Sequence, residues 1–371
     1  MLGFAEQTGL RGAAPNQRYL WTDAFAVCNF IVLSRSTTDQ TYLALARDVV
    51  ERVHQTLGHH RDDDPRRGWL SGHDELTGSR HPTRGGLRIG KPLPERRPDE
   101  PLDPELEWER DGQYFHYLTK WMHALDRLSR VTREPRFNLW ARELLEVAHR
   151  KFTVRSPVLA PRLYWKMSTD LSRPLVTSSG QHDALDGLLL AEELGLTAVE
   201  LETAEEGPDL RDAARDFSLM LERVELSTTD PLGLGELLGA ACQAVRLPGD
   251  ALGAVLLPRL LSSASEGLRE YERSEPFASP PMFRLAFREL GLGIGLSSVE
   301  IVRRELEGRT DELAAQARAA LEGVEPFVPL SDAIRSFWLD PEHQRGSTWT
   351  EHRAINEVML ATALVPGGYL A

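Results

Sequence analysis

Apolar positions recur along this chain at spacings of three and four residues, and alternating apolar and polar runs are nearly absent. The first spacing is the period of an α-helix, whereas alternation would indicate β-strands. The pattern therefore predicts about a dozen helices. We expect them at residues 21–35, 39–58, 112–132, 136–152, 183–195, 208–224, 231–245, 250–272, 282–291, 294–307, 311–323 and 348–364, with a short extra turn at 331–338.

The predicted helices alternate between two kinds. The first, fifth and seventh contain the runs AFAVCNFIVL, ALDGLLLAEEL and GLGELLGAACQAV and are apolar on nearly every side, whereas the second, YLALARDVVERVHQTL, has a charged stripe. A helix that is apolar all round is covered on both sides. We therefore predict an all-α fold, an (α/α)6 barrel whose six hairpins place odd helices inside and even helices outside. The alternative is a helical-repeat solenoid.

Aromatic and polar residues gather at the start of each odd-numbered helix. These clusters cover residues 19–23, 108–121, 163–187, 227–236, 279–289 and 337–356. In a barrel of hairpins, the starts of all inner helices lie at one end, so the six clusters are expected to converge there. Long loops within a compact domain are usually functional. We expect one domain over residues 1–371, with a long loop insertion at about 60–110 and the site at the loop end.

Composition narrows the classes of protein. The net charge of −13 argues against a broad nucleic-acid-binding surface, because such surfaces are basic. No apolar run reaches the length of a membrane span, and the first residues lack the basic and apolar regions of a signal peptide. Cys28 and Cys242 fall in apolar helical patterns and are expected to be buried thiols. We expect a cytoplasmic protein without nucleic-acid or membrane partners; a homodimer is compatible with the sequence.

Two short motifs resemble ligand sites but lack the required context. His73, Asp74 and Glu75 match no zinc or calcium spacing. The run GLGIGL, which begins at Gly291, has no strand before it and is expected to serve close helix packing rather than dinucleotide binding. No cofactor and no metal are predicted.

The segment DGQYFHYLTKWMHALDRLSRVTREPRFNLWARELLEVAHRKF, which starts at Asp111, resembles a pattern of the N-acylglucosamine 2-epimerase family. In that pattern a helix with Lys and Trp is followed by a turn and an Ala-rich outer helix. The family belongs to the six-hairpin superfamily, which also contains many glycoside hydrolases. The resemblance implies the (α/α)6 barrel and activity on carbohydrates. Those epimerases carry a His and a Glu about four positions apart on an inner helix; SSGQHDALDG here has His182, Asp183 and Asp186 instead.

The third predicted helix carries a polar stripe. Gln113, His116, Lys120 and His123 share one face at helical spacing. Burying such groups without partners costs about 1–3 kcal/mol each. Either a pocket that holds a hydroxyl-bearing ligand or a hydrogen-bond network between helices would satisfy them. We expect the pocket around Asp111 to His116 and the network at His123.

Two other helix starts supply candidates. His182 and Asp183 open the fifth helix, where Asp183 is either a reactive carboxylate or an N-cap. The last helix opens with a cluster in which Glu351 is expected to form a capping box with Thr348. The residues predicted to bind substrate are Asp23, Tyr114, His116, Trp165, Lys166, Trp349, Arg353 and Asn356.

Three functions fit these residues. A sugar epimerase or aldose–ketose isomerase would use His182 and His352 as acid and base, with Arg353 stabilising the oxyanion. A glycoside hydrolase would use the paired carboxylates of Asp111 and Asp183. The third alternative is a non-catalytic barrel that binds sugars or proteins. The favoured prediction is the first, with a sugar or oligosaccharide as ligand and with Asp111, His116, His182, Asp183, His352 and Arg353 lining one cavity.

Overall fold

The computed structural model describes residues 1–156, 160–247 and 252–370, and over these residues the predicted all-α class is confirmed. The chain forms two compact units, Met1–Val224 and Glu225–Ala371. The prediction that residues 1–371 form one domain depends on how these two units are placed relative to each other, so it stays a prediction. Among the described residues, no helix has both the length and the apolar character needed to cross a membrane.

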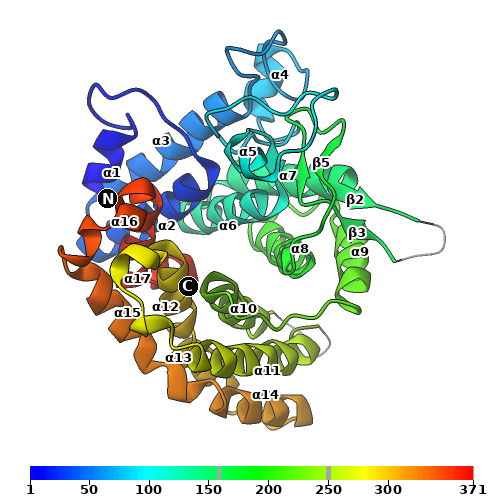
Figure 1. Ribbon diagram of the computed structural model, residues 1–371. Helices are drawn as coiled ribbons and strands as arrows, with labels where there is room; N and C mark the ends of the chain where they lie inside the picture. Colours follow the sequence, from blue (N-terminus) through cyan, green and yellow to red (C-terminus); the bar gives the residue numbers. More distant parts are fainter. Residues whose placement is uncertain (157–159, 248–251, 371) are drawn as a thin grey trace. The chain divides into compact units, whose positions relative to one another are not determined.

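The first unit is built from helical hairpins (Figure 1). Its helices are α1 (Leu2–Gln7), α2 (Leu20–Thr37), α3 (Gln40–Leu57), α4 (Glu75–Arg80), α5 (Pro104–Glu109), α6 (Phe115–Thr132), α7 (Pro135–Phe152), α8 (Asp183–Glu200) and α9 (Arg211–Leu221). Three hairpins follow in order, because α2 packs on α3, α6 on α7 and α8 on α9. Helix α6 also contacts α2 and α8, so these three helices form a row that their partners cover.

The hydrophobic pattern explains this arrangement. Every residue from Leu20 to Ile31 of α2 is buried, as expected for a helix covered on both sides. Helix α3 buries only one stripe, which includes Leu45, Val49 and Val53. The predicted difference between the two kinds of helix is therefore observed in this hairpin.

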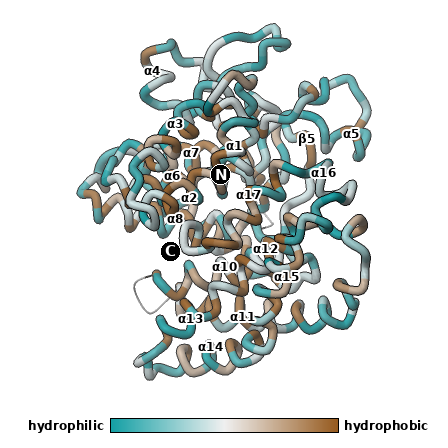
Figure 2. Tube along the Cα trace, turned by 90° about the vertical axis from the view of Figure 1, so that its left-hand side faces the viewer, coloured by the Kyte–Doolittle hydropathy of each residue, from teal (hydrophilic) through white to brown (hydrophobic). Residues whose placement is uncertain are grey.

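The long connection between α3 and α6 has structure of its own. Asp74 caps α4 by accepting from the Thr77 amide, and Asp103 caps α5, whose first residue is Pro104. Figure 2 shows that the loops around α4 and α5 are largely hydrophilic. Neither short helix was predicted, because six residues are too few to display helical periodicity.

Small antiparallel sheets, also unpredicted, fasten the loops to the helices. β1 (Gln113–Tyr114), β4 (Lys166–Met167) and β5 (Pro174–Val176) form one sheet in the order β1-β4-β5, and β2 (Thr153–Val154) pairs with β3 (Arg162–Leu163). The first sheet sets Tyr114 opposite Lys166. Helix α6 begins at Phe115, three residues after the predicted start at 112, because this strand precedes it. Strands of two or three residues are too short to produce recognisable alternation.

The second unit contains the remaining helices. They are α10 (Pro231–Ala244), α11 (Leu252–Arg273), α12 (Ala286–Leu296), α13 (Val299–Leu306), α14 (Glu312–Glu322), α15 (Pro329–Leu339), α16 (Ser347–Glu351), α17 (Arg353–Leu364) and α18 (Gly367–Leu370), with 3-10 turns η1 (Pro276–Ala278), η2 (Pro281–Phe283), η3 (Glu325–Phe327) and η4 (His343–Arg345). Helix α12 packs on α10, α15 and α17, and α11 packs on α10 and α14. Residues 250 and 251, the predicted start of the helix at 250–272, lie outside the described residues.

Glycines allow α10 and α12 to approach closely. A Cβ atom on Gly235 would collide with the Gly291 carbonyl, and one on Gly295 would collide with Gly235. The GLGIGL run therefore serves helix packing. One predicted detail is wrong: the helix at 348–364 is broken at His352, and Thr348 bonds the Pro281 carbonyl at 3.2 Å instead of forming a capping box.

Candidate functional site

A stack of rings stands at the start of α6. Tyr114 ends β1, and its pairing with Lys166 brings the neighbouring Trp165 over its ring, with centroids 4.9 Å apart and planes at 16°. The His116 ring is nearly parallel to both, at 6.0 Å from Trp165 and 5.6 Å from Tyr114. The short sheet thus assembles a flat aromatic surface from two segments distant in sequence.

Helix α2 adds a further ring to this stack. Trp21 lies 6.1 Å from His116 and 5.3 Å from Tyr117. We call Trp21, Tyr114, His116, Tyr117 and Trp165 the aromatic cluster. Three of the polar-aromatic segments noted in the sequence therefore meet in this unit. The Trp21 Nε1 and Tyr114 hydroxyl groups are buried and have no hydrogen-bond partner among the described residues.

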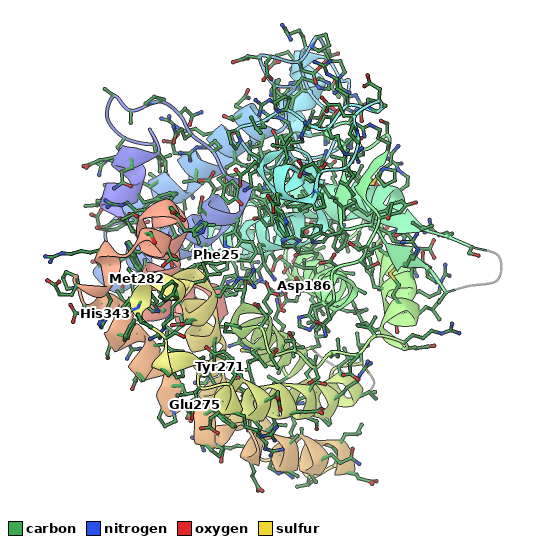
Figure 3. The ribbon with its side chains drawn as sticks, viewed as in Figure 1. Phe25, Asp186, Tyr271, Glu275, Met282 and His343 are labelled. Atoms are coloured by element: carbon green, nitrogen blue, oxygen red, sulfur yellow. The ribbon has the colours of Figure 1, made fainter. Side chains whose placement is uncertain are left out.

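Polar contacts join α6 to α8 beside the cluster. The Lys120 ammonium donates to Asp186 at 2.8 Å, and His123 lies 3.9 Å from Glu193. The Thr119 hydroxyl also donates to Asp186, at 3.1 Å. Figure 3 labels Asp186 on α8. From Lys120 onward, the polar stripe of α6 is therefore satisfied by a network between helices, as expected for His123.

His116 is electrically neutral at ordinary pH. Burial is the main cause of a pKa lowered to about 3, and the nearby Lys120 charge lowers it further against the opposing effect of Asp186. A neutral imidazole has one nitrogen that donates and one that accepts a hydrogen bond. His116 can therefore contact a hydroxyl or carbonyl oxygen without carrying a charge.

Asp111 is enclosed and serves the architecture. Its side chain is 0% exposed, and its Oδ2 accepts from Arg88 Nη1 at 2.5 Å. Its Oδ1 accepts from the amides of Gly90 and Gly112, both at 3.0 Å. These bonds tie the long loop to the start of α6. The geometry argues against the expected catalytic role of Asp111, because both carboxylate oxygens already have fixed partners.

Lys166 is also fully used. Its ammonium donates to the Glu107 carbonyl at 2.7 Å and the Arg110 carbonyl at 2.9 Å, and it pairs with the Glu107 carboxylate at 2.8 Å. An ammonium has three donors. These partners hold the buried Lys166 against the end of α5, which argues against the expected contact of Lys166 with substrate.

Asp23 is likewise occupied within the first unit. It accepts from Arg18 and from the Tyr19 amide, each at 3.1 Å. Burial raises its pKa to about 6, although Arg18 opposes that shift. Asp23 therefore fixes the entry to α2, and these contacts argue against the expected role in substrate binding.

His182 and Asp183 lie at the beginning of α8. His182, which is 8% exposed, is the N-cap residue, and its carbonyl accepts from the Asp186 amide at 3.0 Å. Asp183 is the first helical residue rather than the N-cap, and its Oδ2 accepts from the Gly180 amide at 3.1 Å. His182 thus lies one helical turn before Asp186.

The candidates on the last helices belong to the second unit. Asn356 is buried, accepts from the Phe287 amide at 3.0 Å and donates to the Trp349 carbonyl at 3.1 Å. Trp349 is buried as well, so both residues are structural in this setting. His352 and Arg353 are exposed at the start of α17. The acid–base pair of His182 with His352 joins residues of different units and stays a prediction.

Sequence reasoning missed two residues that hold the second unit together. Arg284 makes a bidentate bond to Glu289, at 2.8 and 2.6 Å, and both are buried. Glu289 also accepts from Trp338 at 2.8 Å, and the Arg284 guanidinium lies 3.9 Å from the Phe337 ring centroid. The sequence signal for this pair is the close spacing of Arg and Glu in the run SPPMFRLAFRE, residues 279–289. That run was predicted only as one of the six polar-aromatic clusters.

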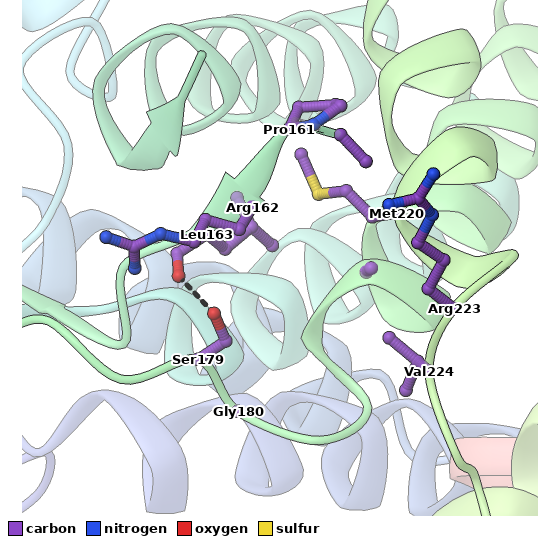
Figure 4. Close-up of a pocket in the computed structure, with 10 residues that line it drawn as sticks. Pro161, Arg162, Leu163, Ser179, Gly180, Met220, Arg223 and Val224 are labelled. Atoms are coloured by element: carbon purple, nitrogen blue, oxygen red, sulfur yellow. Dashed lines mark hydrogen bonds between the residues drawn. The ribbon is translucent and has the colours of Figure 1, made fainter. Parts of the chain in front are cut away.

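A cavity of about 250 Å³ lies near the start of α8 (Figure 4). It lies between β3, the loop before α8 and the end of α9, where the Ser179 hydroxyl donates to the Leu163 carbonyl. None of the predicted site residues lines it. Among the described residues, no group of three or more His, Cys, Asp or Glu side chains is arranged to hold a metal ion.

Comparisons with known proteins reveal similarity to solved structures. No protein-family model matches the chain, and no curated protein matches it. A solved structure of cellobiose 2-epimerase from Spirochaeta thermophila is similar over 94% of this chain and 87% of that chain, with 14% sequence identity and a TM-score of 0.49. The function of this chain therefore has to be inferred from its own residues.

Proposed function

We propose that this protein is a carbohydrate-active enzyme that moves a proton at the carbon beside a sugar carbonyl, as an epimerase or aldose–ketose isomerase does. The aromatic cluster and the adjacent Lys120–Asp186 pair are its sugar-binding face. The observation that carries the proposal is the neutral His116, stacked parallel to Trp165 and close to Lys120 and Asp186. This combination offers an apolar ring surface together with donors and acceptors.

The chemistry requires three contributions. Ring carbons of a sugar pack on flat aromatic side chains, which the partly exposed Trp165 provides. A developing oxyanion is stabilised by a fixed donor, and a neutral imidazole such as His116 can supply one. Proton transfer itself needs an acid–base group, for which His182 at the start of α8 is the proposed residue.

The hydrolase alternative is less well supported. It needs two carboxyl groups that face the scissile bond, one of which donates a proton. Asp111 is enclosed by an arginine and two amides, and Asp183 is buried at the helix start. This geometry favours proton transfer by histidine over hydrolysis by paired carboxylates.

Solvent deuterium incorporation tests the proposal. Reducing sugars incubated with the native protein in D2O should gain deuterium at the carbon beside the carbonyl. His182→Asn should lower the rate by roughly 10²–10⁴, the usual effect of losing a general acid or base. A matched control is His343→Asn in the second unit.

A panel of chromogenic glycosides should be run in parallel. Cleavage of a glycoside without deuterium incorporation would establish the hydrolase alternative. Full activity of His182→Asn would remove this residue from the mechanism, and sugar binding without either reaction would identify a non-catalytic barrel.

A further inference from the structure

The long loop between α3 and α6 builds a second cavity in the first unit. It has a volume of about 740 Å³ and lies between turns near Arg61, Leu93 and Asp170. Sites for small molecules usually measure roughly 300–1,000 Å³. None of the residues of the aromatic cluster lines it. We call it the loop cavity.

Arg66 organises one wall of the loop cavity. Its guanidinium donates to Asp64 at 2.8 Å, to Asp170 at 2.6 Å and to Glu95 at 3.2 Å. Asp170 is held in turn by the hydroxyls of Ser168 and Ser172, both at 2.7 Å. These polar groups are therefore fixed before any ligand arrives, which lowers the entropy lost on binding.

The charges around the loop cavity balance. Five arginines and five carboxylates line it, so the formal sum, 5 − 5, is zero. The Arg66 hydrogen bond lowers the pKa of Asp64. Burial raises the pKa of Asp170, but the serine hydrogen bonds and the Arg66 charge outweigh burial and hold this pKa at about 2. Both carboxylates therefore stay ionised. Carboxylates in the lining would therefore repel a phosphate, and guanidinium groups in the lining would repel a cation.

The loop cavity also has apolar walls. Leu93, Pro65, Pro94 and Pro98 line it beside the ion pairs. A ligand that fits needs hydroxyl groups that both donate and accept, apolar C–H surfaces and no net charge. Neutral carbohydrates have these properties. Anions and free metal ions lack them.

We propose that the loop cavity is a binding site for neutral carbohydrate, separate from the aromatic cluster. It would hold a sugar unit by the fixed arginine and carboxylate groups, with proline and leucine against the sugar ring. This site does not depend on the proton transfer proposed above, since it contains no acid–base histidine.

Leu93→Trp is a substitution that fills the loop cavity. Leu93 is 39% exposed, and its backbone bonds to Glu109 and Asp111 do not involve its side chain. The matched control is Leu76→Trp on α4, where Leu76 is 63% exposed and does not line the loop cavity. Arg97→Ala, an exposed residue of the lining, is the second variant, which tests the site by removing groups instead of adding bulk.

Binding is measured by saturation-transfer NMR and calorimetry with neutral disaccharides, glucose 6-phosphate and inorganic phosphate as probes. The native protein and Leu76→Trp should bind a neutral disaccharide alike. Leu93→Trp should weaken that binding by at least about tenfold, and Arg97→Ala by a smaller factor. Trp165→Ala should leave in place the part of this binding that Leu93→Trp removes, because Trp165 belongs to the aromatic cluster and does not line the loop cavity.

Three results would overturn the proposal: no binding of any neutral disaccharide, equal binding by Leu93→Trp and the native protein, or tighter binding of inorganic phosphate than of sugar. Failure of the proposed enzymatic function is distinguishable from these. It would appear as absent deuterium incorporation, whatever the disaccharide binding of Leu93→Trp.

Discussion

Two carboxylates near α6, those of Asp111 and Asp186, have different roles. Asp111 accepts from one arginine and two backbone amides and is 0% exposed. Asp186 accepts from Lys120 and Thr119, and its side chain is 12% exposed. The first is enclosed by the long loop, whereas the second lies on a helix face beside aromatic rings. The number of fixed partners, more than burial, separates the structural group from the candidate functional group.

Replacing the enclosed pair should produce the largest loss of stability. In Arg88→Met with Asp111→Leu, the amides of Gly90 and Gly112 lose their acceptor, and the carbonyls of Thr56 and His59 each lose a donor. Each buried group left unpaired costs about 1–3 kcal/mol, so we expect a total of at least about 4 kcal/mol for the four groups. Urea unfolding measures it. A double variant as stable as the native protein would break the comparison.

Replacing the α6–α8 pair should affect activity instead. Lys120→Met with Asp186→Leu substitutes apolar groups for a buried ion pair, which is often neutral for stability. Thr119 keeps its bond to the His116 carbonyl at 2.7 Å. We expect a free energy of unfolding within about 1–2 kcal/mol of the native value. Deuterium incorporation should fall at least about tenfold, since polar groups of the proposed sugar-binding face are gone. Unfolding of this variant, or full activity, would contradict the distinction drawn above.

As the pH falls, the packing around His116 in the aromatic cluster should lose stability before the long loop between α3 and α6 does. The pKa of His116 is about 3 in the folded protein, lowered by burial and then by Lys120 from its ordinary value of 6.5. The folded state therefore binds this proton less readily than the unfolded state. The resulting stability is fully present above pH 6.5 and is lost as the pH falls toward 3. Burial also lowers the pKa of His54 to about 3, so His54 contributes to the pH dependence of stability over the same pH range.

His116→Gln tests this pH dependence. Glutamine cannot titrate, so the variant's urea midpoint should decline less steeply than the native midpoint between pH 6.5 and 3. His54→Gln provides a comparison at a residue outside the aromatic cluster. Identical slopes for His116→Gln and the native protein would show that His116 is not held neutral by the fold.

Much of the fold follows from local sequence patterns. Asp230 and Pro231 mark the start of α10, and Asp39 caps α3 by accepting from the Thr41 amide. Period and capping are local properties, so the long helices were predicted within a few residues. The break at His352 was not, because the helical pattern continues across it.

The site was harder to predict because its contacts are distant in sequence. Asp186 lies 66 residues from Lys120, and Arg88 reaches Asp111 from a loop without periodicity. No spacing rule links such pairs. The sequence pattern therefore predicts a catalytic role for Asp111 and none for Asp186. The stack of Tyr114 on Trp165 depends on two-residue strands that leave no pattern.

The smallest expected effect concerns a single hydroxyl. The Tyr114 side chain is 1% exposed, and its hydroxyl has no hydrogen-bond partner among the described residues. Tyr114→Phe removes that buried group and keeps the ring that stacks on Trp165 and His116. Since an unpaired buried hydroxyl is unfavourable, the variant should be as stable as the native protein or more stable by up to about 1 kcal/mol. Trp165→Leu is the contrasting variant, because it removes the ring surface and should weaken sugar binding. If Tyr114→Phe is instead clearly destabilised, the hydroxyl has a partner in solution, and the aromatic cluster is a closed structural core rather than a surface open to a ligand.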